Sequence, residues 1–221
     1  MKDTKYEKIY LDLQDKIIQH KIPAGTKLNE KELMEEYSIG RTPFRSIVKQ
    51  LELEYLVQVI PQSGTYVKTI NLDELKDVLE MRIPLELLAA KMIIYRITNE
   101  QFEKINYILF NLRKNIETLT LSEVKNYTDQ IHNLYYLSSG NEIVTNNLIA
   151  LHNYSARAWY EYNHEKKSAK NTIHEWTNIM KIIESKNVEE LQILVKDHVL
   201  NFASSLGLEC LQINSNSSSS S

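Results

Sequence analysis

Apolar residues recur at helical spacing through residues 1–54 of the chain. The pattern predicts three helices, separated by the breaker "KIPAG" and by the short stretch "SIG". Asn29 is placed to cap the second helix, and Glu32 is placed to complete a capping box with it. Pro43 fits the first turn of the third helix, where no backbone donor is needed. The residues expected to face a shared core are Ile9, Leu13, Ile17, Ile18, Leu33, Tyr37, Phe44, Ile47, Val48 and Leu51.

The spacing changes from helical to alternating in "LVQVIPQSGTYV", which covers residues 56–67. Val57 and Val59 alternate with Gln58 and Ile60, and the segment then turns through "PQSG" into a second short run. Alternation around a turn that contains proline and glycine is typical of a hairpin. We therefore predict a two-stranded hairpin directly after the third helix.

From Asn71 onward the pattern is helical almost without interruption. Asn71 is the expected cap of a long first helix, and Pro84 inside this helix predicts a kink. Thr98 begins the next helix, and Thr120 or Ser122 begins the one after it. About six helices are expected in all, with breaks that include Gly140-Asn141 and Lys186-Asn187.

These patterns predict a mainly α protein with two domains and a tail. Residues 1–70 would form three helices plus a β-hairpin, and residues 71–207 would form an all-α helical bundle. Residues 208–221 end in "NSNSSSSS", a low-complexity composition that we expect to be disordered. The short connector "KTINLD" would join the two domains.

Composition narrows the class of protein. The chain of 221 residues is 43% hydrophobic with only 5 Gly and 4 Pro, which argues against an all-β architecture rich in tight turns. Its one cysteine, Cys210, cannot form an internal disulfide, so a reducing compartment is expected. The start "MKDTKYEKIY" lacks the apolar core of a signal peptide, and no run of apolar residues is long enough to span a bilayer. We expect a cytoplasmic protein with no membrane partner.

The distribution of charge points to one face of the third helix as the candidate contact with nucleic acid. The net charge is −3, and residues 1–70 hold 11 Lys and Arg against 10 Asp and Glu, so any contact with nucleic acid must come from a local patch. Arg41, Arg45 and Lys49 fall four residues apart on the third helix, away from its apolar stripe. Such a face suits the DNA major groove, because arginine can form two hydrogen bonds with guanine. Glu52 and Glu54 would repel phosphate and confine the contact to the first two turns.

The hairpin would lie beside that helix and bring Ser63, Gly64 and Thr65 to the DNA backbone or minor groove, and glycine would allow a close approach. The arrangement is that of a winged helix-turn-helix, in which the second helix supports the third. A second interpretation stays open. The cations would then form an ordinary solvated face, and the hairpin would only cover a core.

Residues 17–67 resemble the N-terminal domain of GntR-type bacterial transcription regulators. The resemblance implies contacts with double-stranded DNA from Lys31, Arg41, Thr42, Arg45 and the wing at Gly64. Three positions depart from the family pattern and leave the operator sequence open: Gly40 replaces a hydroxyl residue, Phe44 a smaller apolar residue and Tyr55 a turn glycine. The residues that match in register are Pro23, Gly25, Leu28, Leu33, Arg41, Thr42, Pro43, Arg45, Leu51, Leu56, Val57, Gly64 and Val67.

Residues 72 to about 203 resemble the FadR-type FCD effector domain that often follows this module. Arg82 and Glu86 match the family's first helix, "IHNLYYLSSGN" matches its histidine motif, and "VEELQILVKDHVLNF" matches its last helix. The resemblance implies a homodimer whose bundle binds a small-molecule effector and alters the winged domains, with the connector "KTINLD" as the coupling element.

Many such domains hold a divalent metal through one aspartate and three histidines. Here His132 and His198 match two histidine positions, but Thr128 stands where the aspartate is expected, and Asp129 is one residue off. Trp176 stands at the third histidine position. The candidate metal ligands are therefore Asp129, His132 and His198, an incomplete set that disfavours a divalent metal cofactor.

His174 lies two residues before Trp176, which places it on another side of the helix. Trp176 would also occupy volume that a metal-bound ligand would use, so a small organic acid or a smaller, more apolar or neutral effector is expected. Arg82 and Arg157 could each pair with an acidic effector or with an internal carboxylate such as Glu86. The proposed effector pocket comprises Arg82, Asp129, His132, Arg157, Trp176 and His198.

The sequence thus predicts a dimeric, ligand-responsive regulator, most often a repressor in this family, which binds a near-palindromic DNA operator. One alternative is a regulator of the same fold that senses a metal ion. A remote alternative is a helical-bundle metalloenzyme, which would need paired Glu-x-x-His motifs that the chain does not show.

Overall fold

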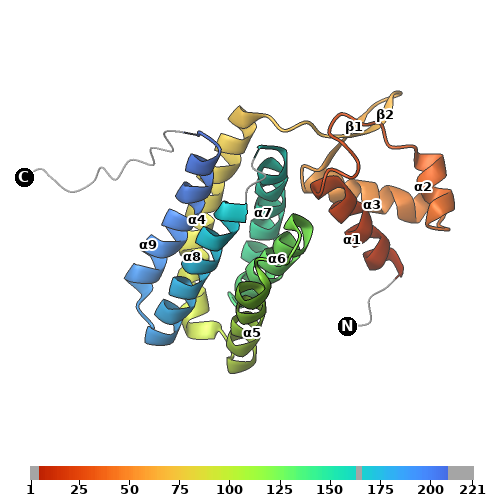
Figure 1. Ribbon diagram of the computed structural model, residues 1–221. Helices are drawn as coiled ribbons and strands as arrows, with labels where there is room; N and C mark the ends of the chain where they lie inside the picture. Colours follow the sequence, from red (N-terminus) through yellow and green to blue (C-terminus); the bar gives the residue numbers. More distant parts are fainter. Residues whose placement is uncertain (1–4, 163–165, 209–221) are drawn as a thin grey trace, which may run out of the picture.

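The computed structural model describes residues 5–162 and 166–208 and confirms the mainly α architecture (Figure 1). The winged part consists of α1 (Lys5–Ile18), α2 (Glu30–Glu36), α3 (Arg41–Leu53), β1 (Val57–Ile60) and β2 (Gly64–Val67). The bundle consists of α4 (Leu72–Arg96), α5 (Asn99–Asn115), α6 (Leu121–Leu137), α7 (Glu142–Tyr162), α8 (Lys166–Ser185) and α9 (Val188–Ser205). Residues 209–221, which include Cys210 and most of the predicted tail, lie outside the described residues.

The winged part has an apolar core of its own. Helix α3 buries Phe44, Ile47, Val48 and Leu51 as its sequence pattern predicts. These side chains pack with the buried faces of α1 and of the hairpin. Gly40 precedes α3 and provides no side-chain cap, which fits the missing hydroxyl residue at this position.

The hairpin forms as predicted, and a third segment supports it. Strands β1 and β2 pair antiparallel from Val57 opposite Val67 to Ile60 opposite Gly64. The loop before α2 bonds to the far edge of β2, because the Leu28 amide donates to the Thr65 carbonyl at 2.8 Å. The wing is therefore fixed to the start of α2.

Most predicted helix starts are confirmed by their caps. The Asn29 side chain accepts a bond from the Glu32 amide, which is the asparagine half of the predicted capping box. Asn71 caps α4, and Thr98 and Thr120 each form a full capping box with the residue three positions later. Such caps contribute about 1 kcal/mol each. Helix α4 is continuous through Pro84.

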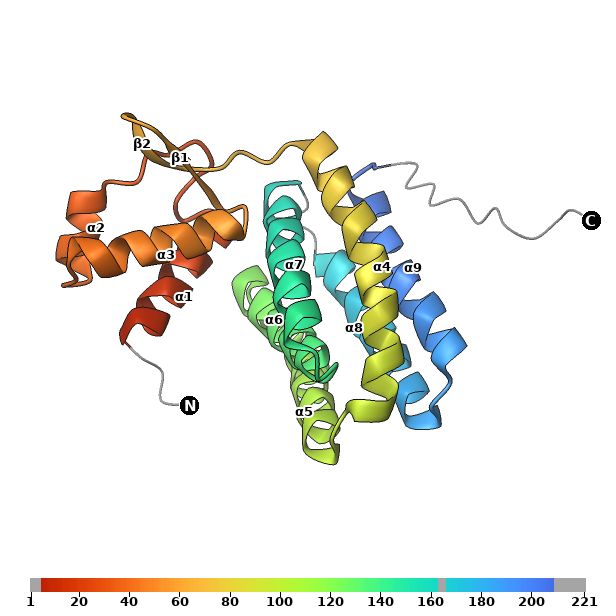
Figure 2. The same ribbon diagram turned by 180° about the vertical axis from the view of Figure 1, so that it is seen from behind.

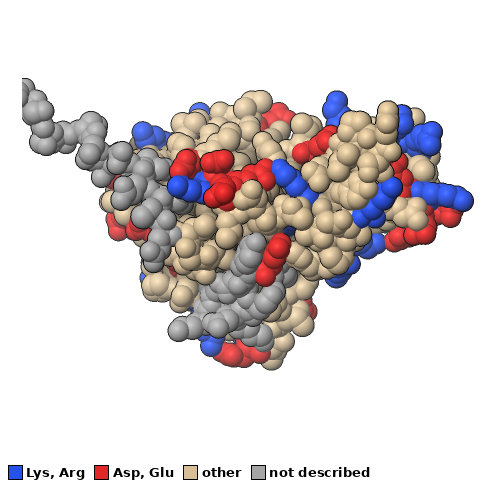
Figure 3. Space-filling view, turned by 90° about the horizontal axis from the view of Figure 1, so that it is seen from above, with Lys and Arg blue, Asp and Glu red and all other residues tan. Residues whose placement is uncertain are grey.

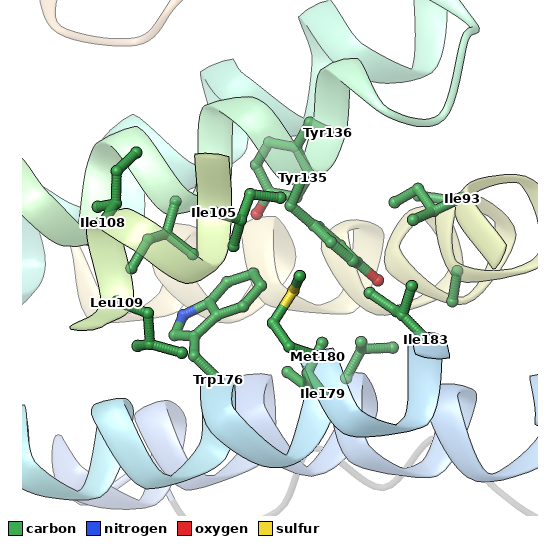
Figure 4. Packing of buried hydrophobic residues seen from close by; sticks show 14 of the residues in the cluster. Ile93, Ile105, Ile108, Leu109, Tyr135, Tyr136, Trp176, Ile179, Met180 and Ile183 are labelled. Atoms are coloured by element: carbon green, nitrogen blue, oxygen red, sulfur yellow. The ribbon is translucent and has the colours of Figure 1, made fainter. Parts of the chain in front are cut away.

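The bundle packs α4 against α7 and α9, and α5 against α6 and α8 (Figures 1 and 2). Its core is aromatic at the centre. Trp176 and Met180 extend from α8 toward Tyr135 and Tyr136 of α6 (Figure 4). The Trp176 and Tyr135 rings lie edge to face with centroids 5.2 Å apart, a favourable geometry for aromatic pairs. Among the described residues, none of the helices has the length and apolar character needed to cross a bilayer.

Candidate functional site

The predicted cationic face of α3 is exposed to solvent. Arg41, Thr42, Arg45 and Lys49 are all exposed, whereas the opposite side of the helix is buried. Lys and Arg side chains gather at the end of the molecule formed by the winged part (Figure 3). Because α3 begins at Arg41, its free backbone amides and its first cations lie at the same end, where they favour a phosphate.

Glu54, which was expected to repel phosphate from the end of α3, does not lie at the surface. It is 6% exposed, and its carboxylate accepts hydrogen bonds from Tyr10 and, at 2.6 Å, from the Gln14 amide. Burial, followed by the charge of Glu54, raises the pKa of Tyr10 well above its ordinary value. Glu52 instead accepts a bond from the Val59 amide at 3.1 Å and so links α3 to the wing.

The tip of the wing is exposed at Ser63 but not at Thr65. Ser63 lies at the surface, with its hydroxyl 2.7 Å from that of Tyr66. The prediction that Thr65 faces DNA is wrong, because its side chain is 1% exposed and its hydroxyl donates to Glu30 at 3.0 Å. Gly64 has φ +130°, and a Cβ there would lie 2.8 Å from Cε of Lys27. Glycine is needed at this position for its backbone conformation, whereas the flexible end of Lys27 could move aside.

An open hollow of about 550 Å³ lies between the wing and the start of α2. Lys27 and Lys31 line it together with Gly64 and Glu30. The side chain of Lys31 is 85% exposed and is only loosely paired with Glu35, at 4.0 Å. The hollow thus brings two cations together between the wing and the start of α2.

A cluster of three imidazoles lies inside the bundle. His132 of α6 stacks on His152 of α7 with ring centroids 4.0 Å apart, and its Nε2 atom lies 3.2 Å from Nε2 of His198 on α9. Trp176 of α8 lies edge to face with His132, at a centroid distance of 4.8 Å. The structure brings together the predicted His132, His198 and Trp176 and adds His152. The sequence analysis missed His152, although it falls four residues after the buried Leu148 on the same helix.

The hydrogen bonds of the cluster determine where its protons lie. Nδ1 of His132 is 2.8 Å from the Thr128 carbonyl oxygen, so this nitrogen must donate and Nε2 must accept. His198 then donates from Nε2 to His132, and its Nδ1 atom lies 2.6 Å from an oxygen of Glu175.

The pKa shifts of His132 and Glu175 agree with this arrangement. Burial, and then the neighbouring groups His152, His198 and Arg82, lower the pKa of His132 well below its ordinary value. Burial raises the pKa of Glu175, but the hydrogen bond with His198 and the interaction between the two side chains outweigh it, and the net shift is downward. Glu175 is thus an ionised partner for Nδ1 of His198.

These residues do not fit the metal site that the family resemblance implies. One oxygen of Asp129 accepts from Nε2 of His152 at 3.0 Å, and the other pairs with Lys125, so both oxygens of this predicted metal ligand have partners within the chain. At the third histidine position, Trp176 presents an indole ring in place of an imidazole that could bind a metal. Across the described residues, no group of three His, Cys, Asp or Glu side chains is arranged to hold a metal ion. His174 is exposed and bonds to Asn178, so it does point elsewhere, as predicted.

Arg82 has an internal partner. Its Nε atom lies 3.1 Å from a carboxylate oxygen of Glu86, and its other end bonds to the Tyr136 hydroxyl at 3.0 Å. Tyr136 in turn donates to the same carboxylate at 2.7 Å. This closed triad decides between the two alternatives for Arg82 in favour of the internal carboxylate.

Arg157, which was predicted to line the effector pocket, bonds instead to the winged part and the connector. Its fully buried guanidinium donates to the backbone carbonyls of Tyr55, at 3.4 Å, and of Lys68. Both carbonyls belong to the winged part and its connector, so Arg157 joins α7 to that part of the chain. Beside it, Tyr154 donates to Glu74 at 3.0 Å, and Glu74 also pairs with Lys68.

Comparison with known proteins identifies both parts. Residues 5–67 match the family model "Bacterial regulatory proteins, gntR family", and residues 77–201 match the FCD domain model. The HTH-type transcriptional repressor RspR of Escherichia coli K12 is 29% identical over 128 residues, 58% of this chain and 56% of that protein. The chain thus spans about half the length of this relative. The Nta operon transcriptional regulator of Aminobacter aminovorans is 20% identical over 183 residues, 82% of this chain and 85% of that protein.

Solved structures share the fold. E. coli McbR/YncC superposes with a TM-score of 0.78 at 17% identity, over 92% of this chain and 97% of that chain. Streptococcus agalactiae GntR gives a TM-score of 0.51 at 23% identity, over 90% and 99% of the two chains. At these identities the likeness concerns the fold alone.

Proposed function

We propose that this chain, which belongs to the gntR family of bacterial regulatory proteins and carries an FCD domain, is a ligand-responsive repressor that binds a near-palindromic operator as a homodimer. Family membership makes it a helix-turn-helix transcription regulator and not an enzyme, which removes the metalloenzyme alternative. The repressing role is proposed because RspR of E. coli is a transcriptional repressor.

The exposed cationic face of α3 beside the wing is the observation that carries the proposal. Arg41 and Arg45 would reach base edges in the major groove, where arginine forms paired bonds with guanine. Thr42 and Lys49 would bind the phosphate backbone, as would Lys27 and Lys31 of the neighbouring hollow. Ser63 and the backbone at Gly64 would contact the adjacent groove.

Substitution of Arg45 tests this assignment. Arg45→Ala should weaken binding to a DNA fragment from upstream of the gene by about 1–3 kcal/mol, measured by fluorescence anisotropy. Lys104→Ala removes another exposed cation, from α5, and serves as the matched control. Equal affinities for the wild type and Arg45→Ala would show that α3 does not read the operator.

The effector proposed for the bundle is a small uncharged molecule. Each cation near the imidazoles already has a carboxylate partner within the chain, since Arg82 pairs with Glu86, Lys125 with Asp129 and His198 with Glu175. By contrast, Trp176 Nε1, the Tyr135 hydroxyl and His152 Nδ1 are buried without a hydrogen-bond partner among the described residues. A ligand with one donor and one acceptor would satisfy such groups. This supports an uncharged ligand over the organic acid suggested by the family.

The groups at the expected metal-ligand positions argue against the metal-sensing alternative. We propose that the regulator works without a metal. The carboxylate that a metal would need, Asp129, is bonded to His152, and Trp176 replaces the third imidazole.

Melting curves test both the uncharged effector and the absence of a metal. A chelator should leave the melting temperature unchanged, and neutral amides should raise it more than carboxylates of the same size. A stoichiometric metal ion in the purified protein, or stabilisation by carboxylates alone, would contradict the proposal.

A further inference from the structure

Near the tip of the wing, the hairpin is held from both sides at the residue pair Val59 and Thr65. In an antiparallel ladder, alternate pairs direct their backbone groups outward. The Val59 amide donates to a carboxylate oxygen of Glu52 on α3 at 3.1 Å. On the other strand, the Thr65 carbonyl accepts from the Leu28 amide at 2.8 Å, just before α2 begins. The wing is therefore joined to α3 and to the start of α2, beside which it lies in Figures 1 and 2.

The side chain of Thr65 adds a second carboxylate contact at the same place. Its hydroxyl is buried and donates to an oxygen of Glu30, the first residue of α2, at 3.0 Å. A hydroxyl that is removed from water needs an acceptor, because folding otherwise leaves it unpaired. Glu30 supplies that acceptor from a helix 35 positions earlier in the chain. Glu30 and Glu52 thus hold opposite strands of the hairpin at one register position.

Both carboxylates lie where a negative charge opposes DNA binding. Glu30 lines the hollow that also contains Lys27 and Lys31, the proposed phosphate contacts. Glu52 is exposed on α3, the helix whose cationic face is proposed to read DNA. A carboxylate repels a nearby phosphate, so neither residue is expected at a DNA-binding surface unless it has another role. Their bonds to the wing provide that role.

We propose that Glu30 and Glu52 are positioning residues for DNA binding, which hold the wing at a fixed distance from α3. Neither carboxylate contacts DNA in this assignment, and each acts through the strand to which it bonds. A wing that is held in place before DNA binds loses less conformational entropy on binding, which favours affinity. The tip at Ser63 and Gly64 then meets the DNA while α3 lies in the major groove. The inference rests on the proposed DNA-binding function and names two residues that it needs.

Two substitutions of Glu30 separate positioning from repulsion. Glu30→Gln keeps an oxygen that can accept from Thr65 and removes the charge, whereas Glu30→Ala removes both. Positioning predicts that Glu30→Gln binds the upstream DNA fragment at least as tightly as the wild type and that Glu30→Ala binds about fivefold more weakly, measured by fluorescence anisotropy. If Glu30 only repels phosphate, both variants bind equally and more tightly than the wild type, and the proposal is overturned. Glu52→Gln and Glu52→Ala should follow the same order.

A matched control and a double-mutant cycle test whether Glu30 acts through the wing. Glu32→Ala removes an exposed carboxylate from the same helix and should bind no more weakly than the wild type. Thr65→Val removes the hydroxyl and should weaken binding as Glu30→Ala does. The double variant should then bind no more weakly than the weaker of the two single variants. Losses that add up in the double variant would overturn the proposal.

Footprints on the same DNA fragment separate the wing from α3, and this inference from the proposed function. In Glu30→Ala, protection beside the wing should weaken, whereas the protection that depends on Arg45 should remain. Loss of both would show that Glu30 supports only the fold and would overturn the proposal. If the wild type does not protect the fragment at all, the proposed function itself fails. If the wild type binds and Glu30→Ala binds as tightly, this inference alone fails.

Discussion

The contact between His132 and His198 depends on a single proton. With Nδ1 of His132 committed to a backbone carbonyl, the 3.2 Å approach of the two Nε2 atoms needs His198 as donor, and Glu175 bonds to the other nitrogen of His198. The indole edge of Trp176 packs against His132. The cluster therefore ties α6, α8 and α9 together.

Acid should destabilise the bundle because of these imidazoles. Burial is the main cause that lowers the pKa of both His132 and His152 well below 6.5. The unfolded chain then binds protons that the folded chain does not, so the free energy of unfolding falls as the pH drops below 6.5. Each imidazole can contribute up to about 1.4 kcal/mol per pH unit. The stabilisation of the folded state that comes from the lowered pKa of Glu175 is lost over a lower range of pH, below about 4.5.

Urea unfolding between about pH 7.5 and about pH 5.5 measures this effect. We expect a clear loss of stability for the wild type and a weaker pH dependence for His152→Gln. His174→Gln alters an exposed imidazole and should follow the wild type. A wild-type stability that is constant over this range would show that the buried imidazoles titrate normally.

At the scale of elements, the sequence predicts the helices better than their contacts. Caps at Asn71, Thr98 and Thr120 are local, since each side chain bonds within three residues of its own position. The hairpin and the α3 stripe are also encoded by local spacing. The burial of Thr65 and the committed carboxylate of Asp129 depend on partners on other elements, Glu30 and His152, so spacing alone could not reveal them.

Helix α7 connects the imidazole cluster to the winged part. It carries His152 in the cluster and, five residues later, Arg157 at the junction. The connector that the sequence identified as the coupling element begins at Lys68, whose carbonyl accepts from Arg157. A shift of α7 on ligand binding would thus move the winged part directly.

Arg157→Met should separate effector binding in the bundle from the effect of the effector on operator affinity. It keeps most of the buried volume but leaves two carbonyls without their donor, at a cost of about 1–3 kcal/mol each. We expect a lower melting temperature and a smaller effect of the effector on operator affinity, with effector affinity unchanged. The comparison variant Arg113→Met changes an arginine on α5, far along the chain from the junction. Full coupling in Arg157→Met would exclude α7 as the connection.

At the scale of the whole molecule, two proposed roles fall on different elements. The α3 face would read DNA, and α7 would link the imidazole cluster to the winged part. Two-fold pairing predicts two half-sites separated by whole turns of the double helix, about 10 base pairs each. Contacts with several phosphates also predict that affinity falls steeply with salt.

A footprint of the full-length protein on the DNA upstream of its own gene, repeated at low and high salt, tests the central claim most directly. The account predicts two protected half-sites, related by a two-fold axis, whose protection weakens as salt rises and disappears for Arg45→Ala. An unprotected fragment, or protection that neither salt nor Arg45→Ala alters, would contradict the assignment of α3 as the DNA-reading helix.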